Sequence, residues 1–311
     1  MISLYFILYF LISSFISDNS AQLLKELAVT GKNSEEIILN AEDITLSKEG
    51  LVYLTDKNSY KINIYNSDLK LLTSFGKRGK SLGEFKGPSQ IAVCNDYIAV
   101  SDFISSRVQI FNKKFKPLHI FFAEGPILDL AFDNNGTLII GAYTGQKDRC
   151  LFNYKIDGEL ISVIKLKKTK GDPFMDIFKF TITRDGYIAI VYLVQNIIEV
   201  LDQKHKFVRN IIIDKLPSKP KYKRLNDNFS FPIDNLVQSI ASDSKSRIYI
   251  LANLVTKPKK EVFIYSLDGI YNGSLNLLSE TYELFLKNDS YLYAIEDNRT
   301  TLKKYQLKIN K

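Results

Sequence analysis

Six polar residues recur in this chain, each 21 to 26 residues ahead of an aromatic residue or leucine that closes an apolar run. They are Asp43, Gln90, Asp129, Lys179, Ser239 and Glu283. The carboxylates of Asp43, Asp129 and Glu283 are of the type that binds hard cations such as Ca²⁺, and they could equally orient a polar ligand. No fixed loop spacing accompanies them, so the polar lining of a water-filled channel also explains the pattern. We therefore predict a ligand-binding ring that requires no cofactor, with Ca²⁺ as the one ion to consider.

Few other side chains are candidates for metal binding or catalysis. The chain has two histidines, His119 and His205, and two cysteines, Cys94 and Cys150, which excludes a Cys/His zinc cage and a multi-disulfide scaffold. Neither histidine has a sequence neighbour that makes it a base or a metal ligand, and no nucleophile–base set is evident. We predict no catalytic residues, and the sequence leaves open whether the protein is an enzyme.

A basic, proline-punctuated insertion covers residues 215–224. Its positive side chains are Lys219, Lys221, Lys223 and Arg224. They could meet an acidic polymer or membrane head groups, or they could simply keep a linker solvated. Loops grafted on a repeat scaffold often carry binding specificity, so we keep these residues as a second candidate site.

The elements that must position these residues form a repeat. The residues that close the apolar runs are Tyr65, Phe111, Tyr154, Leu201, Tyr265 and Tyr305, at steps of 46, 43, 47, 64 and 40. Each unit contains several short strand-like runs, and Asn-Gly and Asp-Gly pairs between them are hairpin signals. A period of 40 to 50 residues with several strands per unit predicts an all-β, six-bladed β-propeller of four-stranded antiparallel blades. Because innermost strands line the channel of a propeller, the six polar residues are expected to face it.

The sixth unit supplies only three strands before the sequence ends, while a spare apolar segment lies at residues 23–29. We expect this N-terminal strand to complete the last blade and close the ring. The propeller is therefore assigned to residues 22–311.

Residues 2–16 form an apolar run of the length of a signal-peptide core, followed by polar residues. We predict that residues 1–21 are a signal peptide or an N-terminal anchor and that the protein is exported to the periplasm or the cell surface. The net charge of +8 is spread over turns and strand edges, where it serves solubility, so no nucleic-acid partner is expected. Contact with a membrane is expected only through the N-terminal segment, if it is retained, and we expect a monomer.

The second unit resembles an NHL repeat. The matching residues are Gly83-Glu84-Phe85-Lys86-Gly87-Pro88, Ala99-Val100-Ser101-Asp102 and Arg107-Val108-Gln109-Ile110-Phe111. The first unit keeps part of the pattern and the others have drifted. As an architecture the chain is similar to the exported six-bladed propeller proteins of Bacteroidetes, many of which have no defined biochemical role. The resemblance implies the fold strongly and the function weakly.

Two functions remain open at this level. The first is a non-catalytic propeller that recognises a protein or glycan through one face and its loops. The alternative is a metal-dependent propeller enzyme, similar to lactonases or lyases, with its site at the central channel. Asp102 and Arg107 form a charge pair that we interpret as a structural brace of the second unit rather than a ligand site.

Overall fold

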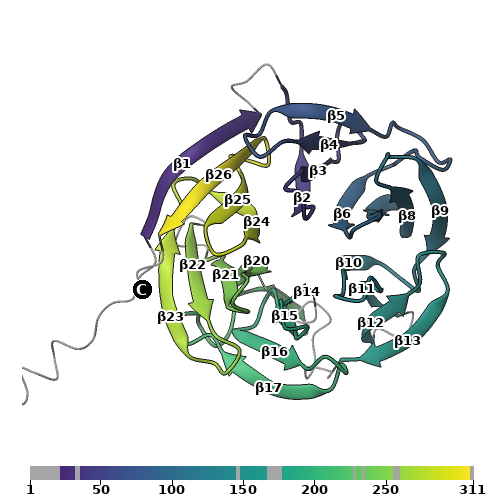
Figure 1. The fold of residues 1–311 in the computed structure, drawn as a ribbon. Helices are drawn as coiled ribbons and strands as arrows, with labels where there is room; N and C mark the ends of the chain where they lie inside the picture. The colour runs from purple at the N-terminus through teal and green to yellow at the C-terminus, as the bar shows by residue number, and fades with distance from the viewer. Residues whose placement is uncertain are drawn as a thin grey trace, which may run out of the picture.

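The computed structural model describes residues 22–31, 36–144, 148–166, 177–226, 229–232, 235–254 and 260–308. Six four-stranded antiparallel sheets stand around a central axis, which confirms the predicted propeller (Figure 1). The predicted signal or anchor segment, residues 1–21, lies outside the described residues. No helix in the described ranges is long and apolar enough to cross a membrane.

The first five blades each use four consecutive strands, from the axis to the rim. Blade one contains β2 (Ala41–Leu46), β3 (Val52–Asp56), β4 (Lys61–Tyr65) and β5 (Leu71–Phe75). Blade two contains β6 (Pro88–Val93), β7 (Tyr97–Asp102), β8 (Arg107–Asn112) and β9 (Pro117–Phe122). Blade three contains β10 (Ile127–Phe132), β11 (Leu138–Tyr143), β12 (Arg149–Tyr154) and β13 (Leu160–Lys165). Blade four contains β14 (Phe178–Ile182), β15 (Ile188–Tyr192), β16 (Ile197–Leu201) and β17 (Phe207–Ile212). Blade five contains β20 (Val237–Ser242), β21 (Ile248–Ala252), β22 (Glu261–Tyr265) and β23 (Tyr271–Asn276).

Blade six joins the two ends of the described chain. Its inner strands are β24 (Thr281–Lys287), β25 (Tyr291–Glu296) and β26 (Thr301–Lys308), and its rim strand is β1 (Gln22–Gly31). β1 runs antiparallel to β26, as predicted. The ammonium of Lys303 lies 3.3 Å from Glu26 on β1 and 3.2 Å from the buried carboxylate of Glu296 on β25. The closure therefore combines a strand ladder with a charge link between the two ends.

The repeated closing residue has one structural role in all six units. It is buried on the third strand of its blade and packs in the apolar cluster shared with the preceding blade. Its exposed fraction is 3% or less for Tyr65, Phe111, Tyr154, Leu201, Tyr265 and Tyr305. Because each blade buries its apolar face only against a neighbour, this position must be large and apolar in every unit.

The connections divide the disc into two faces. The inner strands begin on one face, which also carries the loops between second and third strands and the links from one blade to the next. We call this the ring face, because the six polar residues lie near the starts of the inner strands. The opposite face carries the hairpin turns between first and second strands and between third and fourth strands. The basic insertion lies on the ring face, where its distal part forms a hairpin of β18 (Tyr222–Asn226) and β19 (Phe229–Pro232).

Candidate channel site

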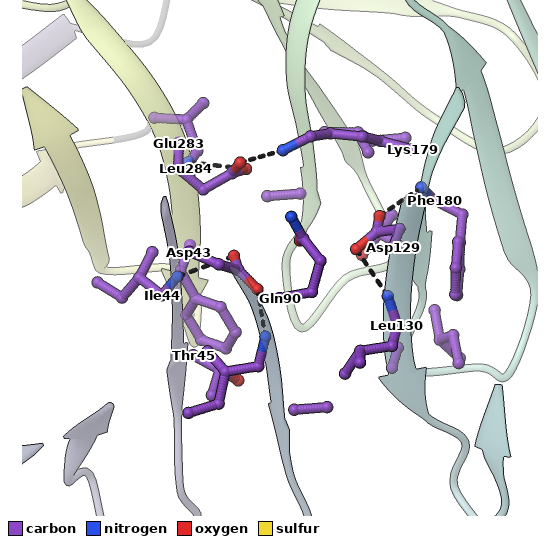
Figure 2. A pocket seen from close by; sticks show the side chains of 18 of the residues that line it. Asp43, Ile44, Thr45, Gln90, Asp129, Leu130, Lys179, Phe180, Glu283 and Leu284 are labelled. Atoms are coloured by element: carbon purple, nitrogen blue, oxygen red, sulfur yellow. Dashed lines mark hydrogen bonds and ion pairs between the residues drawn. The ribbon is translucent and has the colours of Figure 1, made fainter. Parts of the chain in front are cut away.

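The structure brings the six predicted ring residues together around the central axis. Asp43, Gln90, Asp129, Lys179 and Glu283 line a cavity of about 270 Å³, and Figure 2 shows them facing one another from different blades. Ser239 is fully buried and reaches the same group by bonding to Glu283. Below the ring, mainly apolar side chains of the inner strands line the cavity, with Thr45, Thr181 and Ser242 among them.

The ring residues lie at irregularities of the inner strands. The register of strands one and two shifts next to Asp43, Gln90, Asp129, Ser239 and Glu283. Only in blade four, which carries Lys179, is the pairing of the first and second strands regular over the described residues. A β-bulge inserts an extra residue and redirects the local side chains. This places the ring side chains toward the axis and toward the neighbouring blade.

The ring residues of blades one, three and five connect each blade to the next through the main chain. Asp43 accepts the N–H of Ile91 in blade two at 2.8 Å. Asp129 accepts the N–H of Phe180 in blade four at 2.9 Å. The Ser239 hydroxyl accepts the N–H of Leu284 in blade six at 3.3 Å. Asp43 and Asp129 each also accept the N–H of the following residue in their own strand. We call these three residues the stitch residues.

The ring residues of blades two, four and six have longer side chains, which bond to other side chains of the ring. With its amide nitrogen turned toward the carboxylates, Gln90 donates to Asp43 and to Asp129, each at 3.3 Å. The ammonium of Lys179 forms an ion pair with Glu283, which also accepts the Ser239 hydroxyl. We call Gln90, Lys179 and Glu283 the bridge residues. Figure 2 shows the Lys179–Glu283 pair on one side of the channel and the Asp43 and Asp129 carboxylates on the other.

The site holds three carboxylates and one ammonium, so its charges are not balanced. Burial raises the pKa of Asp129 to about 7, although Lys179 and two main-chain N–H groups oppose the shift. Burial, followed by the negative charge of Glu283, raises the pKa of Asp43 well above its usual value. Burial works against the charged form of Lys179, but the three carboxylates together raise its pKa above the ordinary value. Near neutral pH the ring therefore keeps its cation, and Asp129 is partly protonated.

The three carboxylates do not converge on one point. No group of three or more His, Cys, Asp or Glu side chains within the described ranges is placed to hold a metal ion. Asp43 and Asp129 are occupied by main-chain N–H groups, and Glu283 by Lys179 and Ser239. The arrangement suits hydrogen bonding to a polar ligand better than chelation of Ca²⁺, which takes six to eight oxygen ligands.

The remaining candidates lie away from the channel. His119 is exposed on rim strand β9, and His205 is half-buried in the β16–β17 turn with a left-handed backbone of φ 60°. Cys94 and Cys150 are free thiols. Lys219, Lys221 and Lys223 are exposed. Lys223 and Arg224 lie on the hairpin strand β18, so these basic residues are not part of the ring.

Asp102 and Arg107 form a buried ion pair of 3.1 Å in blade two. Asp102 accepts the N–H groups of Lys86 and Gly87, and Arg107 donates to the carbonyls of Lys80 and Glu84. All of these contacts tie the incoming loop to its own blade. The geometry is that of a brace, and Asp56 accepts two N–H groups of its incoming loop in the same way in blade one.

The division into stitch and bridge residues was missed from the sequence, although a signal for it exists. In chain order the ring reads Asp, Gln, Asp, Lys, Ser, Glu, so a shorter side chain alternates with a longer one. A short side chain next to the backbone favours bonding to a nearby N–H, whereas a long one reaches across a channel.

Comparisons with known proteins show the fold and no more. No model of a known protein family matches the chain, and no curated protein matches it significantly. A putative exported protein from Bacteroides fragilis NCTC 9343 shares 14% identity with a TM-score of 0.65, over 95% of this chain and 97% of that one. A catalytically inactive histidine-to-alanine variant of virginiamycin B lyase from Staphylococcus aureus, solved with quinupristin, shares 12% identity with a TM-score of 0.58, over 90% and 99%. Kuenenia stuttgartiensis hydrazine synthase matches with the same four values. The chain thus resembles propellers of diverse activities as well as a putative exported protein.

Proposed function

We propose that this protein is a non-catalytic binding propeller that recognises a protein or glycan across its ring face. The observation that carries the proposal is the difference between the two faces. Large apolar side chains are exposed on the ring-face loops: Ile37, Leu39, Leu82, Phe103, Ile104 and Leu278. Among the described turns of the opposite face, only Ile270 is comparable. Exposed apolar groups gathered on one face are typical of an interaction surface.

The ring face also has prearranged loops. Phe103 and Ile104 lie in a 3-10 turn, η1 (Phe103–Ser105), whose N–H at Phe103 donates to Gly87 at 3.0 Å. The turn ends at Ser106 in a left-handed conformation with φ 47°. A loop held in this way loses little conformational entropy on binding, which favours recognition. In this proposal the cavity behind the loops receives a polar group of the ligand, and Gln90, Lys179 and Glu283 bond to it.

The metal-dependent enzyme is the weaker alternative. One solved lyase of this fold is inactivated by replacing a histidine, whereas both histidines of this chain lie off the channel. The ring carboxylates are separately occupied, as described above. Metal analysis of the purified protein tests this point: Ca²⁺ or Zn²⁺ that is retained by the native chain and lost in Asp129→Asn would establish the alternative.

We further propose that the protein is exported, with residues 1–21 as signal peptide or anchor, and that blade two is an NHL-type repeat. The apolar run at residues 2–16 and the similarity to a putative exported protein support export. The Asp102–Arg107 brace supports the repeat type, because the matching positions are those of the motif.

The test compares the two faces directly. The native chain, a Phe103→Asp/Ile104→Asp variant and a matched Ile270→Asp variant are immobilised and probed with a glycan array and with a native envelope extract. Binding should be lost in the ring-face variant and kept in the Ile270→Asp control. Loss through Ile270→Asp alone, or a ring-face variant that binds like the native chain, would contradict the proposal.

A further inference from the structure

The rim of the disc presents five outer strands besides β1, and they differ in how their free edges are protected. An exposed edge offers unpaired N–H and C=O groups to another strand, and proteins usually guard it with charges, proline, glycine irregularities or side-chain caps. β9 begins with Pro117 and contains His119, β17 carries Arg209 at its centre, and β23 contains Gly273 at φ 120°. The first N–H of β5, at Leu71, donates to the Glu36 carboxylate at 3.1 Å.

Among the described residues, the one such protection of β13 is the charge of Lys165 at its end. Its residues 160–164 read Leu-Ile-Ser-Val-Ile, and it is the edge strand of its sheet (Figure 1). Leu160, Ile161 and Val163 are 40%, 52% and 43% exposed. Exposed apolar side chains on an edge strand whose one charge lies at its end favour association with another strand.

The charges at the two ends of β13 are complementary when β13 of one copy pairs antiparallel with β13 of a second copy. Glu159 precedes the strand and Lys165 ends it, and both side chains are largely exposed, at 60% and 71%. If two copies pair antiparallel with Ser162 on the twofold axis, Glu159 of one copy lies opposite Lys165 of the other. The same register places Ile161 opposite Val163 and Leu160 opposite Ile164. Cross-strand pairs of opposite charge and of β-branched residues both stabilise a ladder.

We infer that β13 is a self-association edge, through which two copies of this chain join blade three to blade three in one continuous eight-stranded sheet. The contact is isologous, because each copy contributes the same strand, so it closes as a dimer and does not propagate. Apolar burial supplies the affinity and the two charge pairs set the register. The proposed dimer differs from the monomer expected from the sequence, and it goes beyond the proposed ligand binding because the rim edge is separate from the ring-face loops.

Glu159 and Lys165 already have partners within the chain. Glu159 lies 2.8 Å from Lys155, and Lys165 lies 3.3 Å from Asp148. The Glu159–Lys155 pair is exposed on both sides and contributes little to stability, so its exchange costs little. Asp148 is largely buried, so exchange of its exposed partner Lys165 costs more. β5 lacks this arrangement: Lys70 precedes it and Gly76 follows it, so a self-paired β5 would have no opposite charges at its ends.

The experiment is sedimentation velocity of the full chain at about 1 to 100 μM, where a dimer must respond to concentration. The native chain should show a monomer–dimer equilibrium. Ile161→Lys/Val163→Lys should remove it, since four like charges would face one another across the ladder. Val208→Lys on β17, an exposed rim position of blade four, is the matched control and should leave the dimer intact.

A charge exchange tests the register without touching the apolar residues. Glu159→Lys and Lys165→Glu should each weaken dimerisation by about tenfold, and the double exchange should restore it. Ser162→Cys should form a disulfide-linked dimer on oxidation. A chain that stays monomeric at the highest concentration, a dimer that survives Ile161→Lys/Val163→Lys, or one that Val208→Lys also abolishes would overturn the inference. Circular dichroism of each variant confirms that it is folded.

Discussion

The stitch residues and the bridge residues of the channel occupy equivalent positions but depend on different partners. Asp43, Asp129 and Ser239 bond to main-chain N–H groups of the next blade, which no substitution other than proline can remove. Lys179 and Glu283 bond to each other, so removal of either one leaves the other without its opposite charge. The comparison teaches that polar groups at one repeated position can bond to the main chain of the next blade in alternate units and to other side chains in the units between.

The bridge pair gives the largest expected effect. Lys179→Met should lower the free energy of unfolding by about 3 kcal/mol, because it leaves Glu283 largely buried without its cation. Lys179→Met/Glu283→Met, which removes both charges, should cost less than about 1 kcal/mol. Urea unfolding of both variants measures the difference. If the double variant is as unstable as the single one, the pair is itself a structural element and the comparison fails.

The pH dependence of stability should come mainly from the stitch aspartates. The pKa of Asp129 is raised from about 3.8 to about 7 in the folded chain, so between these values the folded state binds more protons than the unfolded state. The contribution of Asp129 to the unfolding free energy should therefore fall by about 3 kcal/mol from pH 4 to pH 7 and level off above about pH 8. Unfolding curves of the native chain and Asp129→Asn across this range should converge or cross as the pH rises. Parallel curves would show that Asp129 does not titrate there.

Removing a stitch outright should cost somewhat less. Asp129→Ala should destabilise the chain by about 2 kcal/mol at pH 6, since the buried N–H of Phe180 loses its acceptor. No second substitution among the bridge residues should restore this loss. Thermal unfolding of Asp129→Ala alone and combined with Gln90→Ala checks this, and recovery in the combined variant would argue that the aspartate acts through Gln90.

The smallest effect is expected at Gln90. Gln90→Ala removes two amide hydrogen bonds of 3.3 Å but strands no main-chain group, so it should cost about 1 kcal/mol or less. The same variant should raise the pKa of both aspartates further, because their carboxylates lose a donor. Unfolding at pH 6 and at pH 8 gives both numbers. A loss as large as that of Asp129→Ala would place Gln90 among the stitch residues.

Much of the candidate site could be predicted because blades repeat. A residue such as Tyr65 or Phe111 must be apolar in every unit to fill the space between two blades, so its spacing can be read directly. Counting back from it locates the channel position, and five of the six residues found in this way line one cavity. The bulges at Asp43 and Asp129 could not be predicted from the sequence, because a one-residue irregularity leaves no pattern in hydrophobicity.

The sequence by itself determined the number of blades, the closure by an N-terminal strand and the positions of the ring, because burial of one face against a neighbour imposes a period on the chain. Only the tertiary structure decided what those ring residues bond to. Phe180 follows Asp129 by about fifty residues, and Glu283 follows Lys179 by about a hundred, so no local rule connects them. Hydrogen bonds and charge pairs act over a few ångströms in space, and the ring closure alone brings these residues within that reach.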